Sequence, residues 1–484
     1  MNIKQSFLLI CTVLLMAACS NELEEHPKSI AAEVFYNTPA EVEAGLNAIY
    51  NPMRGSGLLG ALYECQHEIY SEYLYGRGSH APLNDYNGLD NTNITRINGM
   101  WKSLYESIRN ANIVIQKAPQ GTELTQADLD KYLGEARFLR GLCYFYLVRN
   151  WSGVPLRTET NMDTMNLPRA SEQEVYNYLL ADLQWAETHL PDAPRLVGTP
   201  SKWVAKAVLT DVYMNLHQYD LARDKALEVI NSGRFALVNV TVADDFDKLF
   251  GPDANGTSEE IFYLKYARNP SGQGFSYPHY CHYPNSGYYP PGGYYTFYSD
   301  SEQNSFIKNW DKNDLRYIFN WYPQTFGLGP TTILLKKFSD PEAVTAGGND
   351  YPMYRYADIL LFYAEAVAQA EGAPSADAME KLNMVHRRAY GKNPLVPDPT
   401  VDFQLADYAG QQAFIDLVVK ERGYENCGES KRWLDLKRLG IAEEVIAEVK
   451  GKQMTQRHLL WPIPTTEYNY NTAIDPTTDQ NPGY

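Results

Sequence analysis

Apolar side chains recur every three or four residues from about residue 39 to residue 235, and this spacing predicts a series of amphipathic helices. The stretch LDKYLGEARFLRGLCYFYL (129–147) carries two such stripes, one from Leu129 to Tyr146 and one from Phe138 to Phe145. A helix that is apolar on two faces packs between neighbours on both sides, as in a helical stack. The pattern therefore predicts a scaffold of packed helices.

Other segments predict paired helices. The segment WVAKAVLTDVYMNLHQYDLARDKALEVINSG (203–233) predicts two helices joined by a tight turn. Its aromatic and small residues lie where a tetratricopeptide unit places them: Tyr213, Tyr219, Ala222 and Ala226. A second pair is expected at 354–389, and a last helix at about 411–439. The expected fold class is mostly α, a tetratricopeptide-like helical-repeat scaffold with long irregular loops and minor β structure.

The helical arms, 39–235 and 351–440, flank a portion of about 236–350 that is rich in Tyr, Gly, Pro and Asn. Loops of this length in a compact protein are usually functional, so this portion is expected to bind the ligand. The end of the chain, 441–484, is polar and broken by proline, and we expect a coil there. Residues 39–484 are expected to form a single domain.

The N-terminal residues predict export and lipid attachment. Lys4 precedes an apolar stretch that is too short to span a bilayer and that ends in LMAAC at Cys19. This ending resembles a bacterial lipoprotein box, in which cleavage precedes the Cys and that Cys is acylated. We expect residues 1–18 to be a signal peptide and residues 19–38 a lipidated acidic tether. The acidic residues after Cys19 fit either a surface-export signal or a solvated spacer.

The amino-acid composition argues against some classes of binding partner. The formal net charge of −17 weighs against nucleic acid and against an anionic membrane surface, because both require surfaces rich in Lys and Arg. Tyr is in excess, with 37 residues against 17 Phe. Since Tyr joins an apolar body to a polar tip, the excess suggests wet binding surfaces as well as core.

One stretch concentrates these rings without any formal charge: YPHYCHYPNSGYYPPGGYYTFY (277–298). Pro and Gly exclude a helix or a central strand there, and they can hold several rings at fixed angles. A sugar stacks its CH face on an aromatic ring, while its hydroxyls need donors and acceptors, and Tyr offers both. The stretch therefore indicates a carbohydrate platform, although packing onto the helices or contact with a partner protein also fits.

Motifs for metals and cofactors are incomplete, and we expect neither. His279, Cys281 and His282 lie close together, but no further ligand follows at zinc-like spacing. Asp311 and Asp314 are not followed by the Gly and Glu of a calcium loop. No P-loop, GxGxxG or GxSxG motif is present. Acidic residues are numerous enough to leave a glycoside hydrolase as a distant alternative.

Several segments taken together resemble the SusD/RagB family of outer-membrane nutrient-binding lipoproteins (SusD-like). They are LGEARFLRGLCYFYLVRNWSGVPL (133–156), the pair at 203–233, YPMYRYADILLFYAEAVAQAEG (351–372), ERGYENCGESKRWLDLKRLG (421–440), and the closing WPIPTTEYNYN and DQNPGY. They cover nearly the whole chain in the order of the family. One departure is Ser430, where the family usually has Gly.

The resemblance implies a non-enzymatic protein, lipid-anchored in the outer membrane and facing outward. Such a protein captures an oligo- or polysaccharide and delivers it to a TonB-dependent SusC-like transporter. Family sites are shallow aromatic arcs built from the middle region and from an early loop, here about 73–86. The expected ligand-binding residues are Tyr75, Arg77, Asn84, Asp85, Tyr277, Tyr280, Tyr283, Tyr288, Tyr289, Tyr294, Tyr295 and Trp321.

Two alternatives within the same fold stay open: a peptide-binding member and a scaffold subunit of the transporter complex without a ligand. Other conspicuous residues are expected to be structural. Trp101, Trp151 and Trp433 follow helical spacing and are predicted to be core. A charged set is predicted to form ion pairs along one helix: Glu421, Arg422, Glu429, Arg432 and Asp435.

Overall fold

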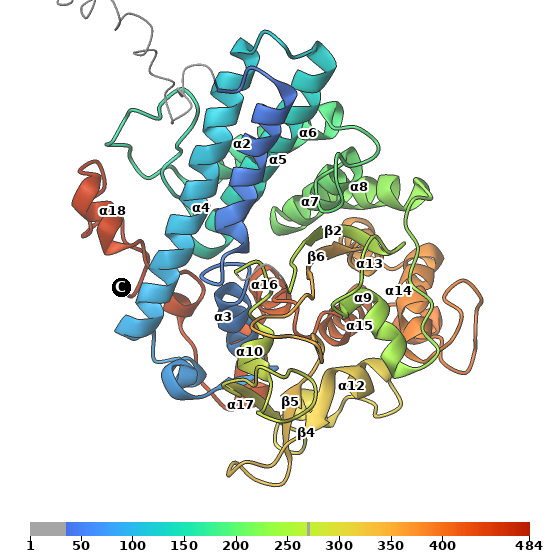
Figure 1. Ribbon diagram of the computed structural model, residues 1–484. Coiled ribbons are helices and arrows are strands. Elements are labelled where there is room, and N and C mark those ends of the chain that lie inside the picture. Colours follow the sequence, from blue (N-terminus) through green and yellow to red (C-terminus); the bar gives the residue numbers. More distant parts are fainter. Residues whose placement is uncertain (1–34, 269–271) are drawn as a thin grey trace, which may run out of the picture.

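The computed structural model describes residues 35–268 and 272–484 (Figure 1). The expected signal peptide, the expected acylation site Cys19 and most of the expected tether lie outside the described residues.

Packed helices make up the larger part of the molecule, as the apolar spacing predicts (Figure 1). The helices α2, α4, α5 and α6 pack in sequence, and α13 packs against α8, α14 and α15. The main helices are α2 (Pro39–Arg54), α3 (Leu62–Tyr70), α4 (Asn91–Lys117), α5 (Gln126–Trp151), α6 (Glu172–His189), α7 (Lys202–Asn215), α8 (Tyr219–Asn231), α13 (Tyr356–Glu371), α14 (Ala376–Ala389), α15 (Gln411–Glu425), α16 (Arg432–Arg438), α17 (Ala442–Lys450) and α18 (Thr465–Tyr470). The expectation of a mostly α fold with minor β structure is confirmed.

Helix α5 shows how the sequence sets this packing. It begins at a capping box in which the Thr125 hydroxyl accepts the N–H of Asp128 and the Asp128 carboxylate accepts the N–H of Thr125. Gly141 lets α6 approach closely, because a Cβ there would lie 3.1 Å from a Leu183 carbon. Arg140 joins the two helices through Asp182, with 2.7 Å between Nε and Oδ2. Trp101, Trp151 and Trp433 are buried, which confirms their assignment to the core.

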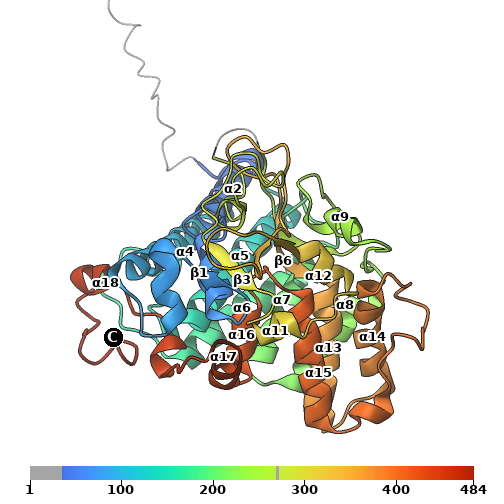
Figure 2. The same cartoon turned by 90° about the horizontal axis from the view of Figure 1, so that it is seen from below.

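The portion between α8 and β6 contains only short elements. They are η3 (Ala243–Phe246), α9 (Asp247–Phe250), β2 (Glu260–Leu264), α10 (Pro278–Cys281), β3 (Phe297–Asp300), α11 (Ser305–Lys308), α12 (Leu315–Asn320), β4 (Trp321–Pro323) and β5 (Thr332–Leu335). An antiparallel sheet with the order β1-β3-β5-β4 includes β1 (Tyr75–Gly76), and β2 pairs with β6 (Tyr351–Arg355). Seen from below, β1 and β3 lie between α4 and α12 (Figure 2).

Two expectations about the C-terminal region were wrong. The single helix expected at 411–439 is broken between Glu425 and Arg432, because Gly428 and Ser430 have left-handed backbones, with φ of 81° and 61°. The coil expected at 441–484 contains α17 and α18. Helix α17 forms because Ala442, Ile446 and Lys450 are buried at helical spacing.

A buried network of charged side chains lies at this break. We call it the hub, and it consists of Arg355, Arg388, Glu259, Glu425 and Glu429. Arg355 at the end of β6 is fully buried and bonds three carboxylates, those of Glu259 (2.8 Å), Glu425 (2.7 Å) and Glu429 (2.7 Å). Arg388 of α14 contacts Glu259 and Glu425 as well. Burial alone would lower the pKa of Arg355, but the three carboxylates hold that pKa well above its usual value. The prediction of ion pairs along one helix was wrong: within the predicted set only Arg422 and Asp435 pair, from α15 to α16, and the other members pair with residues outside the set.

Glu429 and its turn connect the hub to two distant segments. The Glu429 carboxylate accepts from Lys337, the second residue after β5, at 2.5 Å. Glu68 of α3 accepts the backbone N–H of Ser430 at 2.7 Å and that of Gly428 at 3.3 Å. The hub thus ties α3, the strand β5 and the last helices to one point.

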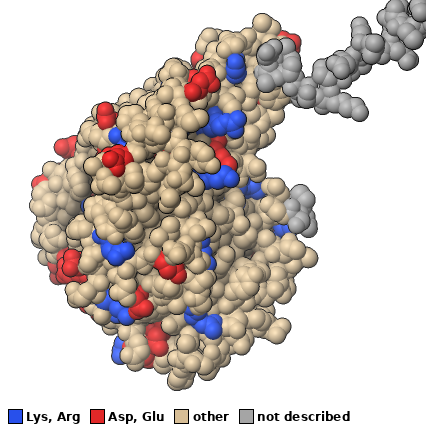
Figure 3. Space-filling model, turned by 90° about the vertical axis from the view of Figure 1, so that its left-hand side faces the viewer, with Lys and Arg blue, Asp and Glu red and all other residues tan. Residues whose placement is uncertain are grey.

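Charge is scattered over one face of the molecule. The face that carries α4 and α18 shows separate acidic and basic side chains without an extended patch of one sign (Figure 3). Among the described helices, none combines the length and the apolar character that crossing a bilayer requires.

Replacing Arg355 with Met leaves Glu259, Glu425 and Glu429 buried with too little positive charge. We expect a loss of about 3–5 kcal/mol in the free energy of unfolding, measured by urea denaturation. The control is Arg223→Met, since Arg223 pairs with Asp220 at the surface and its loss should cost less than about 1 kcal/mol. Equal effects of the two substitutions would contradict the assignment of the hub as the centre of stability.

Ser430→Gly should stabilise the fold. A non-glycine residue at φ 61° is strained, and Gly relieves this at the cost of a more flexible unfolded chain. We expect a gain of about 0.5–1 kcal/mol, seen as a higher melting temperature. Gly428→Ala is the opposite control, because φ is 81° and the new Cβ would lie 2.9 Å from Leu335. A lower melting temperature for Ser430→Gly would refute the strain argument.

Glu68 should make stability fall as the pH rises. Burial raises its pKa to about 8, against about 4.3 in the unfolded chain. Between these values the folded state holds the proton and the unfolded state releases it. The contribution of Glu68 is therefore complete below pH ~4.3 and is lost progressively up to pH ~8.

Glu68→Gln removes this titration. The stability of the variant minus that of the unchanged protein should rise with pH across that window, measured by thermal denaturation at each pH. Glu106→Gln, at an exposed position, should give a flat difference. A flat difference for Glu68→Gln would show that Glu68 is ionised in the folded protein.

Candidate functional site

The sheet β1-β3-β5-β4 brings the early loop to the tyrosine-rich segment. Tyr75 lies opposite Tyr298 in the register of β1 and β3, and their rings stack with 5.6 Å between centroids. The N–H of Arg77 donates to the carbonyl of Thr296 at 2.8 Å. The sheet therefore places Arg77 beside the end of the tyrosine-rich segment.

The tyrosine-rich segment folds back on α10 through backbone hydrogen bonds. The N–H of Tyr294 donates to the carbonyl of His279, and that of Thr296 donates to the carbonyl of Tyr280, each at 2.8 Å. Gly293 permits this approach, because a Cβ there would lie 2.3 Å from the carbonyl oxygen of His282. Gly293 thus permits the close return of the chain. The expectation that proline and glycine exclude a helix or a central strand from this segment was wrong, because it contains the short helix α10 and the first two residues of the inner strand β3.

Three rings and one guanidinium gather at this edge of the molecule. We call Tyr283, Tyr295, Phe326 and Arg77 the aromatic arc. The ring centroid of Tyr295 lies 4.7 Å from that of Tyr283 and 5.2 Å from that of Phe326. The guanidinium carbon of Arg77 lies 4.6 Å from the Tyr295 centroid and 4.8 Å from the Phe326 centroid. All four side chains are half-buried, so part of each remains open to solvent.

Tyr295, at the centre of the arc, has a strained backbone. Its φ is 36°, a value that bulky residues rarely adopt. The neighbouring bonds of Tyr294 and Thr296 hold it there, and Nη1 of Arg77 donates to the Tyr295 carbonyl at 2.9 Å. Strain that the surroundings maintain is concentrated at functional sites, so the conformation supports a binding role for this ring.

The arc combines apolar faces with free polar groups. The hydroxyls of Tyr283 and Tyr295 have no hydrogen-bond partner among the described residues. The side chain of Arg77 makes one hydrogen bond and no ion pair within the described chain, which leaves further guanidinium N–H groups for a ligand. Arg77 is the only charged member of the arc. Such a surface fits a flat, hydroxylated and uncharged ligand.

Several residues expected to bind ligand lie in the core instead. The exposed fractions are 0% for Tyr277, 1% for Tyr289 and 5% for Trp321. Tyr277 packs against Phe275 and Phe338, which excludes its ring from solvent. None of the three offers an open face to a ligand in this structure.

Two polar residues of the early loop have structural contacts. The Asn84 side chain bonds the backbone of Gly76 at both ends, accepting at 2.7 Å and donating at 2.8 Å. Asp85 pairs with Lys452 at 2.7 Å. Neither is part of the arc.

The remaining tyrosines lie outside the arc. Tyr280 is half-buried and stacks on Phe297, and Tyr294 is 64% exposed with its ring 4.7 Å from that of His279. Tyr75 is half-buried beside Tyr298, and its pKa is raised to about 12, chiefly by burial. Tyr288 turns away from the arc and lines a separate cavity.

Sequence reasoning missed Phe326 and Tyr298. Tyr298 ends the tyrosine-rich segment and lies opposite Tyr75 in the register of β1 and β3. Phe326 lies in the connection between β4 and β5, within QTFGLGP. The signal there was an aromatic residue among glycines and proline, the same composition as in the longer stretch.

The suspected metal ligands do not form a metal centre. Burial lowers the pKa of His282 to about 4, and its ring stacks between those of Tyr289 and Tyr322. Cys281 is buried as a free thiol. Within residues 35–268 and 272–484, no three His, Cys, Asp or Glu side chains are grouped as metal ligands would be.

Two family models match most of the chain between them. Residues 326–484 match the SusD family, and residues 23–214 match a family described as starch-binding associating with outer membrane. SusD-like protein P2 of Formosa agariphila is 27% identical, and the alignment covers 99% of this chain and all of that protein. SusD-like protein P38 of the same organism is 28% identical over 96% of each chain.

Solved structures agree on the fold. A SusD homolog from Bacteroides thetaiotaomicron superposes with a TM-score of 0.80 at 20% identity, over 95% of this chain and all of the other. A laminarin-binding SusD-like protein gives 0.72 at 22% identity, over 93% of this chain and all of the other. Surface glycan-binding protein A from Bacteroides fluxus gives 0.74 at 21%, over 92% of this chain and all of the other. The solved structures show that the chain has the SusD fold, and the two family models and the SusD-like relatives support a member of the SusD/RagB family.

Proposed function

We propose that the protein is a cell-surface glycan-binding lipoprotein that captures oligo- or polysaccharide on the aromatic arc. The observation that carries the proposal is the arc itself, in which three half-open rings and one guanidinium are held by a strained backbone. Family membership supports it, since two structural neighbours are named for binding laminarin and surface glycans.

The energetics fit a shallow site. A stacking platform contributes about 1–3 kcal/mol, by analogy with bases stacked on aromatic side chains. Two or three platforms, less the cost of ordering the sugar chain, correspond to micromolar to millimolar affinity, or about −8 to −4 kcal/mol. A polymer that engages many anchored copies tolerates such weakness.

The second part of the proposal is that the protein delivers the bound glycan to a transporter. Acylation at Cys19 would anchor the protein in the outer membrane, and the bound glycan would pass to a TonB-dependent SusC-like transporter. The lipoprotein box and the family described as associating with outer membrane support this part. The protein itself would act by binding and not by cleavage, as the family of binding proteins suggests.

The arc favours sugar over peptide, because it contains one charged residue and peptide sites often add charges for the chain ends. The test is affinity electrophoresis through gels that contain laminarin, soluble starch, mannan, xylan or pectin. Tyr283→Ala/Phe326→Ala, the arc variant, removes two of the three rings. We expect binding to at least one neutral polysaccharide to weaken about a hundredfold, about tenfold for each ring, with an unchanged melting temperature.

The control is Tyr470→Ala, which removes a ring that is 73% exposed on α18, away from the arc. It should leave retention unchanged. Equal retention of the arc variant and the unchanged protein would contradict the arc as the site. Binding of a peptide library with no retention by any polysaccharide would contradict the glycan class.

A further inference from the structure

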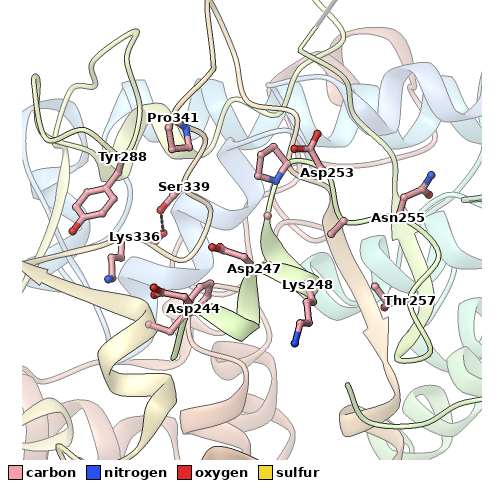
Figure 4. Close-up of a pocket in the computed structure, with 14 residues that line it drawn as sticks. Asp244, Asp247, Lys248, Asp253, Asn255, Thr257, Tyr288, Lys336, Ser339 and Pro341 are labelled. Atoms are coloured by element: carbon pink, nitrogen blue, oxygen red, sulfur yellow. Dashed lines mark hydrogen bonds between the residues drawn. The ribbon is translucent and has the colours of Figure 1, made fainter. Parts of the chain in front are cut away.

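A second hollow lies next to the tyrosine-rich segment and is separate from the arc. It has a volume of about 730 Å³ and lies between η3 with α9 on one side and the segment 336–341 on the other (Figure 4). Tyr288 stands at one edge, and the carboxylate of Asp247 points into the space (Figure 4). The volume suffices for a small ligand such as one or two sugar residues.

Tyr288 links this cavity to the arc. Its ring centroid lies 4.7 Å from that of Tyr322, and the Tyr322 hydroxyl accepts the N–H of Tyr283 at 3.0 Å. The backbone of Tyr288 is fixed as well, because its carbonyl accepts the N–H of Asp340 at 2.8 Å. Asp340 is fully buried and pairs with Arg268. A ring held in this way offers a preorganised wall.

The polar groups of the cavity have few partners within the protein. The carboxylates of Asp244 and Asp247 accept no hydrogen bond from any described residue, and Lys336 forms no ion pair there. The Lys336 nitrogen lies 5.4 Å from the Tyr288 centroid. Lys248, by contrast, is occupied by Asp245 at 2.6 Å. The cavity thus presents free acceptors, one free donor and an aromatic wall.

The charged side chains that line the cavity determine whether it accommodates neutral or acidic sugars. Burial, and then the nearby Asp244, raise the pKa of Asp247, which Lys336 only partly offsets. A further carboxylate or sulfate would meet repulsion here, whereas hydroxyl groups can donate to the two free carboxylates. The cavity therefore fits an uncharged sugar better than an acidic one.

We propose that this cavity is a second sugar-binding subsite, which takes an uncharged branch or terminal residue of the glycan whose main chain lies on the aromatic arc. The proposal rests on the proposed function. Tyr288 forms the stacking wall, Asp244 and Asp247 accept from sugar hydroxyls, and Lys336 donates to a sugar oxygen. The subsite would lengthen the recognised segment of glycan and favour chains that reach from the arc past Tyr322.

The test compares oligosaccharides of increasing length. The polysaccharide of the gel panel that best retains the unchanged protein is cut into a size ladder, and each member is titrated by calorimetry. The cavity variant is Asp247→Ala/Lys336→Met. Its matched control is Asp220→Ala/Lys102→Met, the same changes at exposed positions. We expect the cavity variant to bind the longest members about tenfold more weakly and the shortest members as the unchanged protein does.

The other outcomes separate failure of the subsite from failure of the proposed function. If the arc variant loses binding and the cavity variant matches the unchanged protein at every length, the subsite is refuted and the proposed function stands. Loss at every length in the cavity variant would also refute it, because the cavity would then be the primary site. If the unchanged protein binds no member and no polysaccharide of the panel, both proposals fail. Equal melting temperatures exclude misfolding as the cause.

Discussion

The structure depends on the burial of Arg355 among three carboxylates. Burying an unpaired charge is costly, so Arg355 depends on these carboxylates, and the carboxylates depend on Arg355 together with Arg388 and Lys337. Its partners are Glu259, which immediately precedes β2, Glu425 at the end of α15 and Glu429 in the turn after α15, so the network joins segments near residues 259, 355 and 425. The network therefore specifies one arrangement of these segments, because any other arrangement leaves a buried charge unpaired.

The ligand-binding edge is connected to this centre by short links. Lys337 binds Glu429 and is the second residue after β5, and β5 is the partner of the strand that contains Tyr298. The arc thus lies on connections that begin or end at strands of a small sheet, and this sheet is anchored to the hub. Anchoring of this kind lets Tyr295 keep its left-handed backbone, and fixed rings bind with a smaller loss of entropy. A shallow, rigid and nearly uncharged surface suits a long sugar chain that must be held and then released.

Local patterns predicted the helical scaffold well. The stripes of 129–147 define α5, because a helix packed on two sides must carry apolar residues on both. The break between α15 and α16 was missed, since Ser430 adopts its conformation only where Glu68 of a distant helix accepts its N–H. The composition of 277–298 indicated a platform, but it could not show which of the rings are exposed and which are buried. Tyr277 and Tyr295 are alike in sequence, and only Phe338 and other distant partners decide that Tyr277 is buried.

The most direct measurement of the central claim is a crystal structure of the protein with an oligosaccharide from a polysaccharide that it retains. The account predicts a sugar ring stacked on Tyr295 or Phe326, with Arg77 within hydrogen-bond distance of a sugar oxygen. It also predicts that Tyr295 keeps its positive φ, so that the arc superposes on the unbound form. A sugar bound on the helical scaffold away from the arc, or an arc that rebuilds its backbone around the ligand, would contradict the account.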